Sequence, residues 1–246
     1  MVSASLKTQE TIFSNASIIP KTINFKNYYQ VIKEANFGRY FLNSLFYTTA
    51  TVVLLIVISS LAAFAFSRFK FAGRKIVFAI FISSMMIPLP GSFVVLFVLL
   101  NKLHLRDTAL GYILCMINVG LSLSIFLLKT FFDTIPREIE DLAYLDGCSK
   151  FGIWRHIFLP LAKPMIAVVI IFNALNVWNE YILATLIFDK KSLIPLQRAI
   201  VLFQGEFLTN YPLLMAGLTI ATLPVIIIYL FIGRYIKEVI YEALFG

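Results

Sequence analysis

Side chains that could bind a polar solute recur at regular intervals in the apolar stretch 164–188. Asn173, Asn176 and Glu180 are separated by three and four residues, so they share one face if the stretch is helical. Amides and carboxylates are costly in hydrocarbon unless they meet a partner or a cavity. Two interpretations stay open: these residues line a path for a polar solute, or they form hydrogen bonds between neighbouring helices.

Further residues belong to this candidate path. Trp178 and Asn179 stand beside the same face, and Asn118, Ser122 and Ser124 form a weaker version of the pattern in another apolar stretch. Sugars are bound by planar polar groups together with stacked aromatic rings. The composition therefore permits a sugar as the solute without establishing one.

The residues that usually carry catalysis are dispersed. His104 and His156 fall on opposite sides of the predicted membrane region, and neither Cys115 nor Cys148 belongs to a disulfide framework. An integral-membrane enzyme needs clustered His, Asp, Glu or Cys in or near the bilayer. The sequence therefore argues against an enzyme and predicts no metal site.

Five long apolar runs must position the polar residues. The chain of 246 residues is 60% hydrophobic and only 14% charged, whereas a soluble domain carries about a quarter charged residues. Each run is long enough to cross a hydrocarbon layer of about 30 Å as a helix. The predicted spans are 41–66, 76–100, 108–128, 164–188 and 211–233. The expected fold is an all-α polytopic helical bundle in the cell membrane.

Basic residues in the connections indicate the orientation of this bundle. The connection 67–75, SRFKFAGRK, is strongly basic, and short basic loops stay in the cytoplasm. Alternation then places the loop 129–163 and the tail 234–246 in the cytoplasm, and residues 1–40 outside. Juxtamembrane residues explain the formal charge of +8, so nucleic acid is not an expected partner. Because an outward N-terminal segment without a signal peptide is uncommon, we expect a further span before Met1.

The loop 129–163 contains two short predicted helices. Thr134 is a candidate cap ahead of Pro136, which favours a helix from Pro136 to about Leu145 that stops at Asp146-Gly147. Three acids stand near its positive end: Glu138, Glu140 and Asp141.

The second predicted helix opens at Ser149 and ends before Pro160. One apolar face of it is formed by four residues at spacings of three and four: Phe151, Trp154, Ile157 and Phe158. Such a helix pair suits either a socket for another protein or a cap on the helical bundle.

The loop resembles the cytoplasmic EAA loop of ABC importer permeases. That pattern is E-A-A, three residues, G, nine residues, then I-x-L-P. Here Asp141-Leu142-Ala143 replaces E-A-A, Gly147 follows after three residues, and Ile157-Phe158-Leu159-Pro160 follows after nine more. The resemblance implies contact with an ATPase subunit through Glu140, Asp141, Ala143, Gly147, Ile157, Leu159 and Pro160. Whether Glu140 or Asp141 makes the acidic contact stays open.

The whole chain is similar to one branch of that family, the permeases of carbohydrate importers. The segments NYYQVI (27–32), NSLFYT (43–48), MMIPLP (85–90) and WNEY (178–181) occur in that branch's order. The resemblance implies a type I ABC importer permease fold, usually of six spans, and a path for a sugar or related solute. Its implied partners are a second homologous permease, two ATP-binding-cassette ATPase subunits and an extracytoplasmic solute-binding protein.

No G-x-x-x-x-G-K-[ST] loop occurs in this sequence, so ATP and Mg²⁺ are expected in the ATPase subunits and no cofactor in this chain. The alternative function is an ATP-independent secondary transporter or channel, which often couples transport through ionisable residues inside the membrane. Glu180 is the only acidic or basic residue in the five predicted spans, so the importer permease is the preferred hypothesis.

Overall fold

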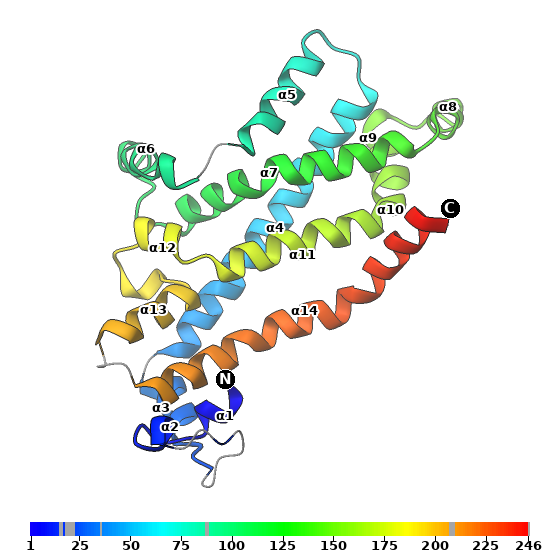
Figure 1. Cartoon of the computed structure of the whole chain (residues 1–246). Helices are drawn as coiled ribbons and strands as arrows, with labels where there is room; N and C mark the ends of the chain where they lie inside the picture. The colour runs from blue at the N-terminus through cyan, green and yellow to red at the C-terminus, as the bar shows by residue number, and fades with distance from the viewer. Residues whose placement is uncertain (15–16, 18–22, 35, 87–88, 207–209, 246) are drawn as a thin grey trace. The chain divides into compact units, whose positions relative to one another are not determined.

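The computed structural model describes residues 1–14, 17, 23–34, 36–86, 89–206 and 210–245, and all regular structure in these residues is helical (Figure 1). The expected all-α fold class is thus confirmed. The chain divides into two compact units. Unit 1 contains Met1–Thr48, Phe97–Tyr112 and Leu175–Tyr229, and unit 2 contains Thr49–Leu96, Ile113–Ala174 and Leu230–Gly246.

Several helices begin in one unit and end in the other. They are α4 (Phe37–Arg68), α6 (Leu89–Lys102), α7 (Ala109–Thr134), α11 (Lys163–Asn179) and α14 (Tyr211–Phe245). The remaining helices of unit 1 are α1 (Val2–Ser5), α2 (Thr11–Ser14), α3 (Lys26–Glu34), α12 (Ile182–Ile187), the 3-10 turn η2 (Lys191–Leu193) and α13 (Leu196–Glu206). Those of unit 2 are α5 (Arg74–Ser84), α8 (Arg137–Leu145), α9 (Lys150–Ile153), the π-helix η1 (Trp154–Phe158) and α10 (Leu159–Leu161).

Two helices in the described part of the chain are long and apolar enough to cross a membrane by themselves, α4 and α7. The bent pair Lys150–Leu161 and Lys163–Asn179 would be a third if it counts as one span, and its two parts meet at 78°. The apolar part of α14 described here, Tyr211–Ile227, is shorter. The number of five spans stays a prediction.

The predicted span 76–100 does not form one helix. Helix α5 ends at Ser84 and α6 begins at Leu89. Pro90 stands in the first turn of α6, where proline is tolerated, and Pro88 lies outside the described residues.

The predicted span 164–188 is also interrupted. Helix α11 ends at Asn179, and the short helix α12 follows. The Leu183 N–H donates to Glu180 Oε1 at 2.6 Å, so the Glu180 carboxylate satisfies a donor in the first turn of α12. A polar residue near a span end therefore starts a new helix instead of continuing the old one.

Helix α14 extends beyond the predicted span 211–233. It includes Pro224 and continues to Phe245, so the predicted tail 234–246 begins inside this helix.

The core of unit 1 surrounds Trp178. This ring is 2% exposed, packs edge-on against Phe41 with ring centroids 5.6 Å apart, and donates its indole N–H to Ala221 O at 3.0 Å. Around it lie the buried residues Val31, Phe37, Leu196, Ile200, Leu214, Ala216 and Ala221. The indole N–H thereby finds a partner inside an apolar cluster, as a buried tryptophan requires.

The core of unit 2 includes a close approach of α7 to α11 and α4. Asn173 Nδ2 donates to Ser124 Oγ at 3.0 Å and to Val169 O at 2.8 Å, while Ser124 Oγ donates to Gly120 O at 2.7 Å. A Cβ on Gly120 would overlap Asn173 Oδ1 and would lie 2.7 Å from Leu55 Cδ1. The missing side chain is what allows these helices to meet.

Candidate functional site: the loop between α7 and α11

The first helix of the loop, α8, closes with a Schellman motif. Gly147 has φ 79°, its N–H donates to Tyr144 O at 3.0 Å, and the Cys148 N–H donates to Ala143 O at 2.9 Å. This pair of bonds satisfies the last carbonyls of the helix and requires a left-handed residue at position 147, which favours glycine. The predicted stop at Asp146-Gly147 is confirmed.

The predicted cap of α8 is wrong, and the helix begins one residue later than predicted. Thr134 is the last residue of α7, and its hydroxyl donates to Phe131 O at 2.7 Å instead of accepting from the new helix. Pro136 is the N-cap residue, and the helix begins at Arg137. Threonine often bonds back to the preceding turn, and here α7 is long enough to use Thr134 in that way.

The second helix begins as predicted. Ser149 Oγ accepts the N–H of Gly152 at 3.1 Å and caps α9.

The predicted end of this helix before Pro160 is wrong. The chain stays helical through Leu161 by widening into the π-helix Trp154–Phe158. Proline removes a donor and crowds the carbonyl four residues earlier, and a π turn relieves both constraints.

Arg68, at the end of α4, contacts the loop through hydrogen bonds and an ion pair. Its Nη2 donates to Phe132 O at 2.8 Å and to Ile135 O at 2.5 Å, and its Nε lies 3.6 Å from Glu140 Oε2. The Arg68 and Glu140 side chains are 4% and 14% exposed. Glu140 therefore forms an internal ion pair, and Arg68 is a residue that positions the loop but is not part of the loop motif. The only sequence signal was its place in the basic segment 67–75.

Aromatic packing secures the second helix to the same place. The Phe158 ring is fully buried and meets Phe64 and Phe132 edge-on, with centroid distances of 4.8 and 5.2 Å. The Arg68 guanidinium lies over the Phe158 ring, with its central carbon 4.8 Å from the ring centroid. Trp154 is also buried, so two of the four predicted apolar residues hold the loop in unit 2.

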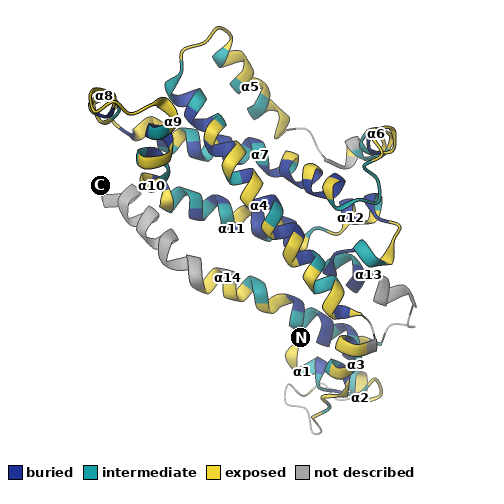
Figure 2. Ribbon diagram, turned by 180° about the vertical axis from the view of Figure 1, so that it is seen from behind, coloured by how far each residue is buried: buried dark blue, intermediate teal, exposed yellow. Residues whose placement is uncertain are grey.

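Several side chains of the loop are exposed, and some of them are apolar. Leu145 is 84% exposed, Leu142 62% and Phe151 58%, and Asp141 is exposed beside them. Figure 2 shows α8 almost entirely in the colour of exposed residues. We call Asp141, Leu142, Leu145 and Phe151 the outer surface of the loop. Leucine and phenylalanine exposed together outside the predicted spans are typical of a surface that another protein covers.

The other motif residues differ in how far they are buried. Ala143 is 6% exposed and faces the interior, whereas Gly147 and Pro160 are exposed and Ile157 and Leu159 are partly buried. A Cβ at Gly147 would meet nothing within 4 Å in this chain. Position 147 is therefore restricted by its backbone conformation and not by space within the subunit.

Tyr144 is linked to the same acid that pairs with Arg68. Its hydroxyl donates to Glu140 Oε1 at 3.4 Å. Partial burial raises the pKa of Tyr144, and the negative charges of Glu140 and Asp141 raise it further. Glu140 therefore has two partners inside the subunit.

The candidate path residues of unit 2 differ from one another. Asn173 is buried, and its amide is used in the contact with Ser124 and Val169. Asn118 is exposed. For Asn173, the geometry supports hydrogen bonding between helices.

The candidate path residues of unit 1 also divide. Trp178 is buried in the core described above, and Glu180 caps α12. Asn176 and Asn179 are exposed, and Asn179 Nδ2 donates to Leu175 O at 2.8 Å. The exposed side chain of Asn176 is accessible to a solute.

No group of three or more His, Cys, Asp or Glu that could hold a metal ion occurs in the part of the chain that the structure describes.

A comparison with known protein families shows which family the chain belongs to. The family described as "Binding-protein-dependent transport system inner membrane component" matches residues 40–238. The matched range includes the loop 129–163 and all of its proposed contact residues. The chain belongs to this family. It is a permease subunit of an ABC importer and not an enzyme, as the sequence analysis expected.

The match to relatives with assigned roles covers most of this chain and most of each relative. The arabinooligosaccharides transport system permease protein AraQ of Bacillus subtilis is 33% identical over 222 residues, which are 90% of this chain and 78% of that protein. The melibiose/raffinose/stachyose import permease protein MelC of the same organism is 30% identical over 236 residues, 96% of this chain and 85% of that protein.

A solved structure agrees with the fold. The crystal structure of a bacterial ABC transporter involved in the import of the acidic polysaccharide alginate contains a chain that matches with a TM-score of 0.83 at 25% identity. The match covers 96% of this chain and 88% of that chain. The expected permease fold is confirmed.

Proposed function

We propose that this permease forms, with a second homologous permease, the membrane path for a sugar or related solute that an extracytoplasmic solute-binding protein delivers. Relatives are transport proteins for arabinooligosaccharides and for melibiose, raffinose and stachyose. The exposed amide of Asn176 is compatible with a hydroxyl-rich solute. The ATP-independent alternative is not carried forward, because the family consists of components of binding-protein-dependent systems.

The outer surface of the loop is the main observation in favour of an ATPase subunit as partner. Asp141, Leu142, Leu145 and Phe151 are exposed on a loop that Arg68 and Phe158 hold rigidly from behind. An ATPase subunit docked on this surface would bury the apolar side chains and would pair a cationic group with Asp141. ATP and Mg²⁺ belong to that subunit in this proposal.

The same geometry supports a cytoplasmic position for the loop. The basic segment 67–75 and the loop lie together in unit 2, because Arg68 contacts Glu140 and the Lys150 ammonium lies 4.6 Å from the Phe69 ring centroid. The positive-inside rule then applies to both segments, and α14 would end on the cytoplasmic side as well.

Co-purification of the ATPase subunit tests which acid makes the contact. Asp141→Ala should reduce the recovered ATPase severalfold while leaving the accumulation of the permease unchanged. Glu140→Ala should lower the accumulation of the permease instead, because it leaves Arg68 without its partner. Loss of the ATPase from the Glu140 variant, with full binding by the Asp141 variant, would reverse the assignment.

Reconstitution tests the transport function itself. In lipid vesicles the subunit alone should neither hydrolyse ATP nor move solute, whereas the complete assembly with its binding protein should accumulate a labelled oligosaccharide. Solute flux through this chain alone would disprove the proposal.

A further inference from the structure

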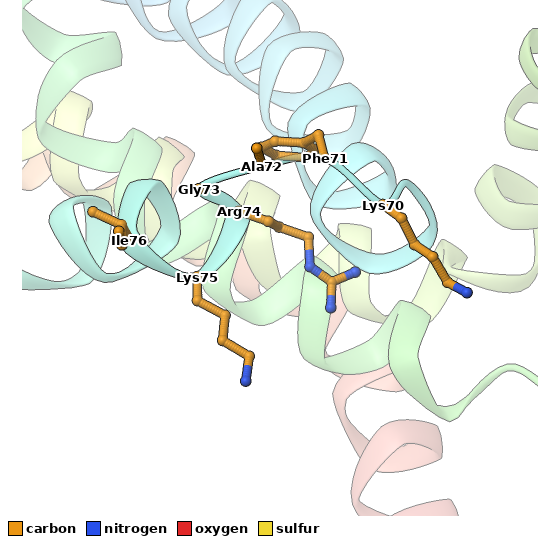
Figure 3. Close-up of a pocket in the computed structure, with 7 residues that line it drawn as sticks. All are labelled: Lys70, Phe71, Ala72, Gly73, Arg74, Lys75 and Ile76. Carbon is orange, nitrogen blue, oxygen red and sulfur yellow. The ribbon is translucent and has the colours of Figure 1, made fainter.

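The turn between α4 and α5 forms a basic concave surface that the transport function does not use. It has a volume of about 690 Å³ and is lined by Lys70, Phe71, Ala72, Gly73, Arg74, Lys75 and Ile76 (Figure 3). In this view the side chains of Lys70, Arg74 and Lys75 extend below the turn, whereas the Phe71 ring lies above it. We call these seven residues the basic turn, and all of them belong to unit 2.

The shape of the basic turn is held by a few contacts of its own. Gly73 has φ 79° and precedes the first turn of α5, and Arg74 Nη1 donates to Phe69 O at 3.1 Å. The Val77 N–H donates to Gly73 O at 2.9 Å. Lys75 and Ile76 stand in the first turn of α5, where backbone N–H groups have no partner within the helix and can bind an anion.

The basic turn and the segments before and after it in the sequence contain no acidic residue. No Asp or Glu occurs in the sequence between Glu34 and Asp107. Two acids of unit 2 are paired with other cations, Glu140 with Arg68 and Asp133 with Lys129. In the described part of the chain, no hydrogen bond or ion pair engages the exposed ammonium groups of Lys70 and Lys75.

Apolar side chains continue from the basic turn along α5. Phe71 is 43% exposed, Ile76 68% and Ile80 63%. The turn also follows directly after Arg68, the end of a helix long and apolar enough to cross the bilayer. A cationic hollow at the end of a span, next to exposed apolar side chains, is complementary to a molecule with an anionic head and acyl chains.

We propose that the basic turn binds the phosphate headgroup of an anionic phospholipid, with Lys70 and Lys75 contacting the phosphate and Phe71 and Ile76 contacting the first part of the acyl chains. A free phosphate would use the same cations but would leave the apolar side chains without a role. The lipid is therefore the favoured occupant.

Native mass spectrometry of the purified full chain in detergent micelles, titrated with phosphatidylglycerol or phosphatidylcholine, tests the proposal. Phosphatidylglycerol should bind more tightly than phosphatidylcholine to the wild type. Lys70→Gln with Lys75→Gln should weaken phosphatidylglycerol binding by about thirtyfold, since each juxtamembrane lysine contributes roughly 1 kcal/mol toward an anionic lipid surface. Each single replacement provides the same test, with a smaller loss, should the double variant prove unstable.

Matched variants separate a specific site from net charge. Lys70→Arg with Lys75→Arg should keep the affinity, and so should Lys26→Gln with Lys102→Gln, which removes the same charge from exposed positions of unit 1. Unchanged binding by the glutamine variant of the basic turn, or an equal loss in the unit 1 variant, would overturn the proposal. Displacement of phosphatidylglycerol by inorganic phosphate at matched ionic strength would identify a free-phosphate site and would overturn the lipid assignment.

Discussion

Gly120 in α7 and Gly147 after α8 both lack a side chain, but for different reasons. At Gly120 a Cβ would overlap Asn173 Oδ1 and crowd Leu55, whereas at Gly147 a Cβ would meet nothing within 4 Å and only the positive φ of 79° is restrictive. At Gly120, in the interior of unit 2, the available volume limits which residues fit. At Gly147, in the loop, the backbone conformation limits them. Substitutions in the interior should cost stability, and those on the outer surface should cost partner binding.

The largest expected effect concerns the residue that joins these two regions. Arg68→Ala should lower the free energy of unfolding by about 3–5 kcal/mol, because it leaves the nearly buried Glu140 carboxylate without its ion pair and frees two buried carbonyls. Thermal unfolding in detergent and the amount of protein in the membrane measure this loss.

An exposed ion pair of the same unit provides the control for Arg68. Lys129 and Asp133 are paired one turn apart in α7, with side chains 24% and 43% exposed. Lys129→Ala should cost at most about 1 kcal/mol. Equal effects of the two substitutions would show that Arg68 does not anchor the loop.

The interior glycine is expected to give the next largest effect. Gly120→Ala should destabilise the subunit by about 1–3 kcal/mol through overpacking between α7, α11 and α4. Gly38→Ala is the matched control, since Gly38 also lies in a helix but has nothing within 4 Å of its Cβ position. That change should be neutral or stabilising by roughly 0.5–1 kcal/mol. If thermal unfolding shows the two variants to be equally stable, lack of space does not explain the glycine at position 120.

The loop glycine should show a smaller change in stability. Gly147→Val should cost about 1 kcal/mol through backbone strain, leave the subunit inserted in the membrane, and weaken its binding to the ATPase. Gly147→Asn should be tolerated better, because asparagine adopts the left-handed conformation more readily. Membrane accumulation and co-purification of the ATPase distinguish the effects. Loss of accumulation with normal ATPase binding in the surviving protein would identify the loop as a cap on the bundle.

The smallest effect on stability is expected on the outer surface of the loop. Leu145→Ser removes a side chain that is 84% exposed, so the free energy of unfolding should change by less than about 0.5 kcal/mol. Binding of the ATPase should nevertheless fall severalfold, because the leucine would be buried on docking. A variant that binds the ATPase as well as the wild type would place the docking surface elsewhere.

The sequence was most informative where one local rule decides the structure. The left-handed stop at Gly147 and the cap at Ser149 depend on neighbours within a few residues, and both were predicted. The same local rules misplaced Thr134 and the end of the second helix, because α7 continues through that threonine and a π turn accommodates Pro160.

Candidate site residues were harder to assign, since their roles depend on distant partners. The steps between Asn173, Asn176 and Glu180 suggested one continuous polar face. Asn173 bonds to Ser124 on another helix, which is one of the two interpretations that the sequence left open, and Glu180 begins a new helix by accepting the Leu183 N–H. Periodicity alone does not show whether an amide meets a neighbouring helix or an open path.

By itself, the amino-acid sequence determined the all-α membrane class, the family, and the place and spacing of the loop between α7 and α11, because apolar length, turn residues and ordered motifs are local properties of the chain. Only the tertiary structure decided that Glu140 pairs with Arg68 while Asp141 stays exposed. Adjacent acids on a helix differ in direction by about 100°, and which of them meets a cation depends on the end of a helix some seventy residues away in the sequence. Burial of that cation is a property of the packed helices and not of either segment alone.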